Sequence, residues 1–273
     1  MRRILLLLLV LLPLCGLAED DEEIFFSDLI GVTTEEAIEI DATVAGDDQP
    51  QEAVPANTAR ADFIERIIAM GYDLYVKADG RAQSAHYKGD IYLCKNFTTH
   101  IFNELRDDFC MAEYPSVRLR IPNNLPKADC KPYYYGLAWE DVAAKDGNPF
   151  YAAAEFRYDK SLTYEENFQL ACDFMRQAQR GDFFQMSAEY EYGTGAHSAI
   201  MMGYDAEKDE IHWMDSNMRG HSRTVNGKSI RYGICQYDEV RDVEWWADAI
   251  CHKNRGATLY RLRDDIQYRE DGN

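Results

Sequence analysis

The sequence predicts an α+β fold in which a helix that begins at a cysteine packs on a small antiparallel, barrel-like sheet. Two stretches, after Cys94 and again over residues 164–178, repeat apolar residues at helical spacing. Strand-like segments then follow one another from Phe183, separated by short polar or glycine-rich turns. A chain in which the helices come first and a meander of strands follows is typical of the α+β class.

The N-terminus has the pattern of a signal peptide. Arg2 and Arg3 precede an apolar run over residues 4–14, and small residues lead to a cleavage site after Ala18. The run is too short to span a bilayer as a helix. We therefore expect residues 1–18 to be removed, the protein to be exported to the periplasm or the medium, and no membrane attachment to remain. A lipoprotein acylated at Cys15, or a retained anchor, is the alternative.

The acidic residues are unevenly distributed. Glu19 to Ala59 contains 13 Asp and Glu and neither Lys nor Arg, within a chain whose net charge is −19. Such a segment repels itself and has few apolar side chains to bury, so residues 19–58 are predicted to be a disordered tail or linker. The remainder is not basic enough to attract a phosphate backbone, which excludes nucleic acid as an expected partner.

Six cysteines follow the signal peptide, an even number that suggests disulfides in an exported protein. Two bridges are plausible, Cys110 with Cys130 and Cys235 with Cys251. Cys172 lies in a helical pattern and is predicted to be a buried apolar residue. Because no CxxC pair occurs, no zinc site is expected, and the sequence indicates no other metal or cofactor.

Two helices are expected before the sheet. The first starts near Arg60 and is interrupted at Gly71, and the second starts at Cys94 and runs to about Arg106. Cys94 would then lie in the first turn of its helix. Unpaired backbone N–H groups and the positive end of the helix dipole favour a thiolate there, and they can also bind an oxyanion formed beside the sulfur.

The region over residues 111–160 is rich in proline and tyrosine and is predicted to be an insertion with short helices, one of them over residues 138–145. A helix over residues 163–179 follows, capped by Ser161 or Thr163.

The next strands place three polar side chains together. Strands are expected over residues 183–190, 197–204 and 210–217, and the last two form a hairpin that closes near residue 207. In that register His197 lies opposite Asp215 or Asn217, and all three share one face of the sheet. A slip by one residue would move the set to the other face. An imidazole held beside a side-chain oxygen is what a general base and its orienting partner require.

The remaining segments extend the same sheet. Residues 219–224 and 230–236 are predicted to form a second hairpin around Asn226-Gly227. A helix over residues 240–249 and a strand over residues 257–263 complete a single domain, residues 59–273. His212 is even-numbered on the strand of Asp215, so it is expected to face away from the site.

The motifs Leu93-Cys94-Lys95-Asn96-Phe97, Gly181-Asp182-Phe183-Phe184, Gly195-Ala196-His197-Ser198-Ala199-Ile200 and Trp213-Met214-Asp215-Ser216-Asn217 occur in an order that resembles the papain-like superfamily. The closest resemblance is to the bacterial cysteine- and histidine-dependent amidohydrolases and peptidases that act on cell walls. The Asp-Cys-Ser-Gly context common in that group is absent here.

The resemblance implies that Cys94 is the nucleophile, His197 the base and Asp215 the residue that orients the imidazole, with Asn217 as the rival third member. It implies an exported cysteine hydrolase that cleaves an amide bond in a protein or in a peptidoglycan stem peptide. Two alternatives stay open. One is a non-catalytic binding or scaffold protein on the same fold with Cys94 in a disulfide, and the other is a structural protein with three disulfides.

Overall fold

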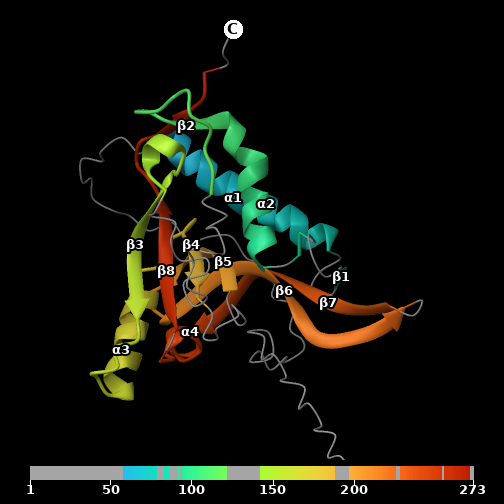
Figure 1. Cartoon of the computed structure of the whole chain (residues 1–273), viewed down its shortest axis with the longest axis vertical. Helices are drawn as coiled ribbons and strands as arrows, with labels where there is room; N and C mark the ends of the chain where they lie inside the picture. The colour runs from blue at the N-terminus through green and yellow to red at the C-terminus, as the bar shows by residue number, and fades with distance from the viewer. Residues whose placement is uncertain are drawn as a thin grey trace, which may run out of the picture.

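The structure, a computed structural model, describes residues 58–78, 83–85, 91–92, 94–121, 142–187, 197–225, 228–253 and 255–270. The predictions for the signal peptide, for all but the last residue of the acidic tail, for Cys130, for the glycine-rich turn before His197 and for the Asn226-Gly227 turn lie outside these residues. Helices and antiparallel sheets make up the described part (Figure 1), so the α+β class is confirmed.

The main sheet has seven strands in the order β1-β7-β6-β5-β4-β8-β3, and all neighbours are antiparallel. The strands are β1 (Gln83–Ala85), β3 (Phe150–Arg157), β4 (Phe183–Met186), β5 (His197–Asp205), β6 (Glu210–Val225), β7 (Lys228–Asp242) and β8 (Gly256–Leu262). A second sheet pairs β2 (Phe109–Met111) with β9 (Ile266–Tyr268). Because β1 and β3 form the two edges, the main sheet is open among the described residues, and the expected barrel-like closure is not found.

Helices cover both faces of this sheet. They are α1 (Thr58–Lys77), α2 (Cys94–Leu105), α3 (Tyr164–Met175) and α4 (Val243–Ile250), with short 3₁₀ turns η2 (Arg106–Asp108) and η5 (Ala144–Asp146). One apolar cluster joins α1 and α2 to the sheet, and a second joins α3 and α4 to it. No helix in the described ranges is long and apolar enough to cross a lipid bilayer.

Successive strand residues divide between the two clusters, as the two-residue period of a strand requires. Phe183 belongs to the α1–α2 cluster and Phe184 to the α3–α4 cluster. Met214 and Trp213 divide in the same way on β6. Burial of such a side chain stabilises the fold by about 1.5–3 kcal/mol. The central strands are therefore apolar on both faces, and their positions are fixed from two sides.

The predicted break in the first helix is wrong, because α1 continues through Gly71. A Cβ atom added at Gly71 would lie 2.1 Å from Sδ of Met214 on β6. The glycine thus marks a close approach of α1 to the side chain of Met214, the residue before Asp215. A pattern that suggests a helix end in isolation is here explained by packing.

Residues 111–160 are not simply an insertion. β3 lies within them and pairs with β8, so this region supplies one edge of the main sheet. The predicted cap of the following helix is confirmed at Thr163, whose hydroxyl accepts a hydrogen bond from the backbone of Glu166 in a capping box. That helix ends at Met175, earlier than expected.

β6 and β7 form one long ribbon. The segments predicted as two strands, residues 210–217 and 219–224, are a single strand, and its partner β7 is almost as long. The outer part of the ribbon extends away from the helices, at the right of Figure 1. Among the described strands, β1 is the one that pairs with it there, through the backbone of residues 231–233.

Candidate functional site

The site lies where the first turn of α2 meets β5 and β6 (Figure 1). Cys94 begins α2, as predicted. The hydroxyl of Ser216 on β6 donates a hydrogen bond of 2.7 Å to the carbonyl oxygen of Tyr92, two residues before Cys94. Since Ser216 follows Asp215, this bond ties the start of the cysteine helix to the strand that carries the candidate orienting residue.

His197 is the first residue of β5, and a β-bulge in the β5–β6 ladder determines which face of the sheet it meets. The pairs on the two sides of the bulge are Asp205 with Glu210 and Met201 with Trp213. Without the bulge, Met201 would pair with the next residue of β6, and every residue nearer the site would meet the opposite face. With it, His197 and Asp215 share a face, as the sequence predicts.

The imidazole and the carboxylate are in direct contact. Nε2 of His197 donates a hydrogen bond of 2.6 Å to Oδ2 of Asp215. Both side chains are buried, with exposed fractions of 0% and 2%. The other oxygen, Oδ1, has no hydrogen-bond partner among the described residues. The carboxylate therefore directs its charge at the imidazole in a site with little water to screen it.

The Cys94 thiol contacts the same imidazole. Burial is the largest single influence and raises the pKa of the thiol, whereas the hydrogen bond and the positive charge of His197 lower it. Backbone hydrogen bonds from Ser198 and Lys95 add to them, so the pKa of Cys94 is below its ordinary value.

The pKa of His197 moves in the opposite direction. Burial lowers it, while the hydrogen bonds and charges of Asp215 and Cys94 raise it, and the net pKa is about 9. A lowered thiol pKa and a raised imidazole pKa stabilise the same state, in which Cys94 is a thiolate and His197 an imidazolium. Such a pair is nucleophilic at neutral pH.

The candidate site includes two contributions that the sequence did not reveal. One is the backbone of Ser198, which forms a hydrogen bond with the Cys94 sulfur. The sequence pattern indicated only the preceding residue, His197. The other is Gln185 on β4, whose Oε1 accepts a hydrogen bond of 2.5 Å from the Ser198 hydroxyl. Gln185 lies opposite Ser198 in the β4–β5 ladder, and both are buried. This pair holds the start of β5, and a known strand register would have been needed to find it.

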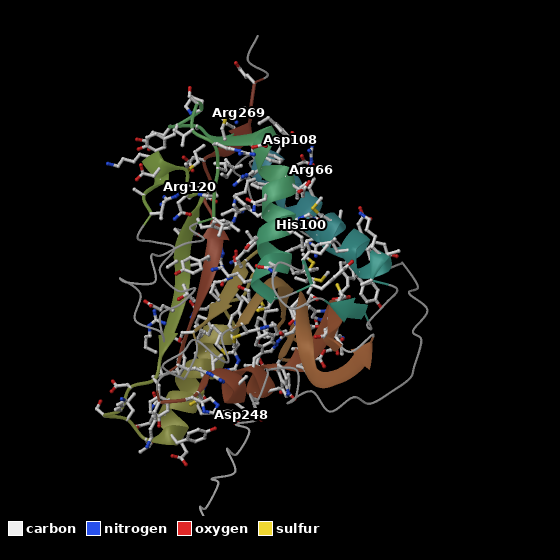
Figure 2. The ribbon with its side chains drawn as sticks, turned by 45° about the vertical axis from the view of Figure 1, so that its right-hand side comes forward. Arg66, His100, Asp108, Arg120, Asp248 and Arg269 are labelled. Carbon is white, nitrogen blue, oxygen red and sulfur yellow. The ribbon has the colours of Figure 1, made fainter. Side chains whose placement is uncertain are left out.

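Other predicted residues lie apart from this arrangement or outside it. Asn217 is two residues beyond Asp215 on β6, and its part in the site stays a prediction. His212 donates from Nδ1 to Asp238 at 2.8 Å, away from Cys94, as expected. His100 lies along α2 (Figure 2), with Nδ1 at 3.7 Å from Glu104.

The predicted bridge between Cys235 and Cys251 is wrong. Both thiols are free, and they lie in different apolar clusters. Cys94, Cys110 and Cys172 are free as well. The bridge from Cys110 to Cys130 involves a residue outside the described ranges. Cys172 is buried on α3, as predicted.

Three potential cation ligands gather at the β5–β6 turn, where ligand atoms of Asp205, Glu210 and His212 lie within 4.8 Å of one another. Two of them have structural partners: Asp205 accepts a hydrogen bond from the backbone of Glu207 in the turn, and His212 pairs with Asp238. We assign no metal to this cluster.

No protein-family model, curated protein or solved structure matches this chain.

Proposed function

We propose that the protein is an exported cysteine hydrolase of papain-like organisation that cleaves an amide bond in a peptide or in peptidoglycan. The observation that carries the proposal is the position of one imidazole between a thiol and a carboxylate. His197 is hydrogen-bonded to Asp215, and its imidazole also interacts with the Cys94 thiol. The first turn of α2 adds backbone N–H groups beside the sulfur.

In the first half of the proposed reaction, the Cys94 thiolate attacks the carbonyl carbon and its oxygen becomes an oxyanion held by N–H groups at the start of α2. The imidazolium of His197 donates its proton to the leaving amine as the C–N bond breaks. A thioester on Cys94 and a neutral imidazole remain. Asp215 keeps the ring oriented throughout, through Nε2.

In the second half, His197 removes a proton from water, and the hydroxide attacks the thioester. The C–S bond breaks, the carboxylic acid product leaves, and the thiolate–imidazolium pair is restored. The chain's own residues supply every proton transfer in this sequence.

The test is to incubate the protein with peptidoglycan sacculi and with a mixed peptide library in ¹⁸O-labelled water. Hydrolysis predicts new carboxyl termini that carry one ¹⁸O, and the Cys94→Ser variant, which retains the fold, should produce none. Transfer of the acyl group to an added amine instead of water would identify a transamidase.

Absence of cleavage together with an ordinary Cys94 thiol, with a pKa of about 8.5, would refute the hydrolase proposal. Cys94 found in a disulfide would refute it as well. Either result would favour a binding or scaffold protein.

A further inference from the structure

Three buried polar side chains form a row across the main sheet next to the candidate site. β4 lies between β5 and β8 (Figure 1). In the two registers Gln185 of β4 lies opposite Ser198 of β5 on one side and opposite Thr258 of β8 on the other. All three residues are exposed by 3% or less. The row begins at Ser198, the residue that follows His197.

This polar row faces α1 and α2. The neighbouring row of the same strands consists of three apolar residues of the α1–α2 cluster: Ile200, Phe183 and Tyr260. Since side chains two residues apart on a strand share a face, the polar row meets the same helices. Nε2 of Gln185 and Oγ1 of Thr258 are buried without a hydrogen-bond partner in the described part of the chain. Burial of an unpaired polar atom destabilises a fold, so packing alone does not explain an amide at this position.

The backbone of β5 alternates its hydrogen-bonding direction along the strand, as in any antiparallel pair. Met201 donates its N–H to the carbonyl of Asp182 at 2.8 Å and accepts a hydrogen bond from the N–H of Gly181 at 2.9 Å. Odd-numbered residues in this part of β5 therefore direct their backbone groups to the β4 side. Ser198 is even-numbered, so its N–H points to the β6 side.

On that side the Cys94 sulfur is the partner of the Ser198 backbone. Within the described residues, the β5–β6 ladder begins at Ile200 with Met214, nearer the turn than Ser198. The cysteine helix α2 contacts both strands, and the Ser198 backbone forms a hydrogen bond with Cys94. A hydrogen bond from an N–H group to the sulfur favours the thiolate over the thiol.

The side chain of Ser198 ties this residue to β4. Its backbone groups point away from β4, but its hydroxyl donates a hydrogen bond of 2.5 Å to Oε1 of Gln185. β4 in turn packs on the cysteine helix, because the ring of Phe183 meets that of Phe102 on α2 edge to face, with centroids 6.4 Å apart. Gln185 therefore links Ser198 to a strand whose position relative to α2 is fixed.

We propose that Gln185 is a positioning residue of the candidate site, which holds the Ser198 N–H against the Cys94 sulfur through the Ser198 hydroxyl. The inference rests on the proposed function and deepens it, since it assigns how the thiolate is kept in place. Hydrogen bonds weaken steeply with distance and angle, so a reactive group needs supporting residues that fix its donors to within about 0.5 Å. Gln185 acts on the sulfur through Ser198.

The pH dependence of Cys94 alkylation by iodoacetamide, followed by mass spectrometry, tests the proposal. Ser198→Thr and Ser198→Val form a matched pair, because the two side chains have the same shape and differ in the hydroxyl. At pH 6.5 the alkylation rate in Ser198→Val should be about fivefold lower than in Ser198→Thr. The pH of half-maximal alkylation should be higher in Ser198→Val.

Gln185→Met removes the acceptor from the other side of the same bond and should also lower the rate about fivefold. Because it removes the unpaired Nε2 as well, thermal unfolding should change little. The double variant Gln185→Met with Ser198→Val should be no slower than the slower single variant, since both changes break one bond. Thr258→Val is the control in the same row, on the side of Gln185 away from Ser198, and should change the rate less than about twofold.

Equal rates in Ser198→Thr and Ser198→Val, or an unaltered rate in Gln185→Met, would overturn the positioning role and leave the proposed function standing. A purely structural pair would give that result together with a lowered unfolding temperature. A rate in Thr258→Val as low as in Gln185→Met would assign the effect to the whole row and overturn the role as well. A wild-type Cys94 that reacts as an ordinary thiol, with a pKa of about 8.5, would refute the proposed function and this inference together.

Discussion

Cys94 and Cys235 lie in two regions of one molecule that are both influenced by Asp215, and their pKa values move in opposite directions. Burial and the Asp215 charge both disfavour the Cys235 thiolate and raise its pKa to about 12. Burial also opposes ionisation of Cys94, yet the pKa of Cys94 is lowered, because His197 contacts the sulfur and is itself held charged by Asp215. A buried carboxylate raises the pKa of a nearby thiol directly. It lowers the pKa of a thiol when a charged imidazole lies between the two groups.

Removal of the imidazole is expected to have the largest effect on the difference between the two thiol pKa values. In His197→Ala the Cys94 thiol should return to a pKa of about 8.5 or higher, where only about 1% is thiolate at pH 6.5. The rate of iodoacetamide alkylation at Cys94, followed by mass spectrometry at that pH, should fall about 100-fold. His212→Ala removes the other histidine–carboxylate pair of the same sheet and should change the rate less than about twofold. An unaltered rate in His197→Ala would contradict the assignment.

Asp215→Asn sharpens the comparison, because it removes the charge and keeps the shape. The pKa of His197 should fall from about 9, since one of the groups that raise it is lost. Alkylation of Cys94 at pH 6.5 should then slow about tenfold. Labelling of Cys235 at pH 10 should move the other way, because its thiolate no longer meets the Asp215 charge. Parallel changes at the two cysteines would refute the comparison.

The His197 pKa also predicts a pH dependence of stability. The folded-state pKa, about 9, lies above the ordinary value of 6.5, so the protonated imidazole stabilises the folded state. That contribution is fully present below about pH 6.5 and is lost as the pH rises through about 9. The difference in urea unfolding free energy between the wild type and Asp215→Asn should therefore shrink by on the order of 1 kcal/mol from pH 6 to pH 9.5. A difference that grows with pH would exclude a charged His197.

The smallest effect on the reactivity of Cys94 is expected from substitution of Cys235. Cys235→Ala deletes a buried sulfur and should cost about 1 kcal/mol in unfolding free energy, through the cavity it leaves. Alkylation of Cys94 should change less than about twofold, because His197 and not Cys235 determines its pKa. A larger change would mean that the two thiols are coupled.

The sequence predicts more of the candidate site than of the fold around it. The start of α2 at Cys94 and the shared face of His197 and Asp215 follow from local patterns, namely helical spacing, strand alternation and turn residues. Asp215 and Asn217 were equally placed by parity, and the hydrogen bond from His197 to Asp215 depends on the detailed path of β6.

The features that sequence could not indicate depend on contacts distant along the chain. The course of α1 through Gly71 is explained by Met214 on β6, and β3 exists as a strand because β8 supplies its partner. The prolines of the 111–160 region suggest loops, and pairing with β8 makes a strand of residues 150–157, which contain no proline. The free state of Cys235 and Cys251 follows from their placement on opposite faces of the sheet.

The bulge between Met201 and Gly203 separates the alignment of the reactive residues from the turn that joins their strands. One ladder runs from the turn to the bulge and another from the bulge to the site. The turn can therefore be rebuilt with another sequence of the same pairing, and His197 and Asp215 keep their places. Deletion of Met202, the extra residue of β5, would merge the two ladders and leave Met201 opposite Trp213, whereas deletion of one residue between His197 and Met201 would turn His197 to the other face. For protein engineering, and for natural variation, the turn and the bulge residue are tolerant positions, and the segment from His197 to Met201 is not.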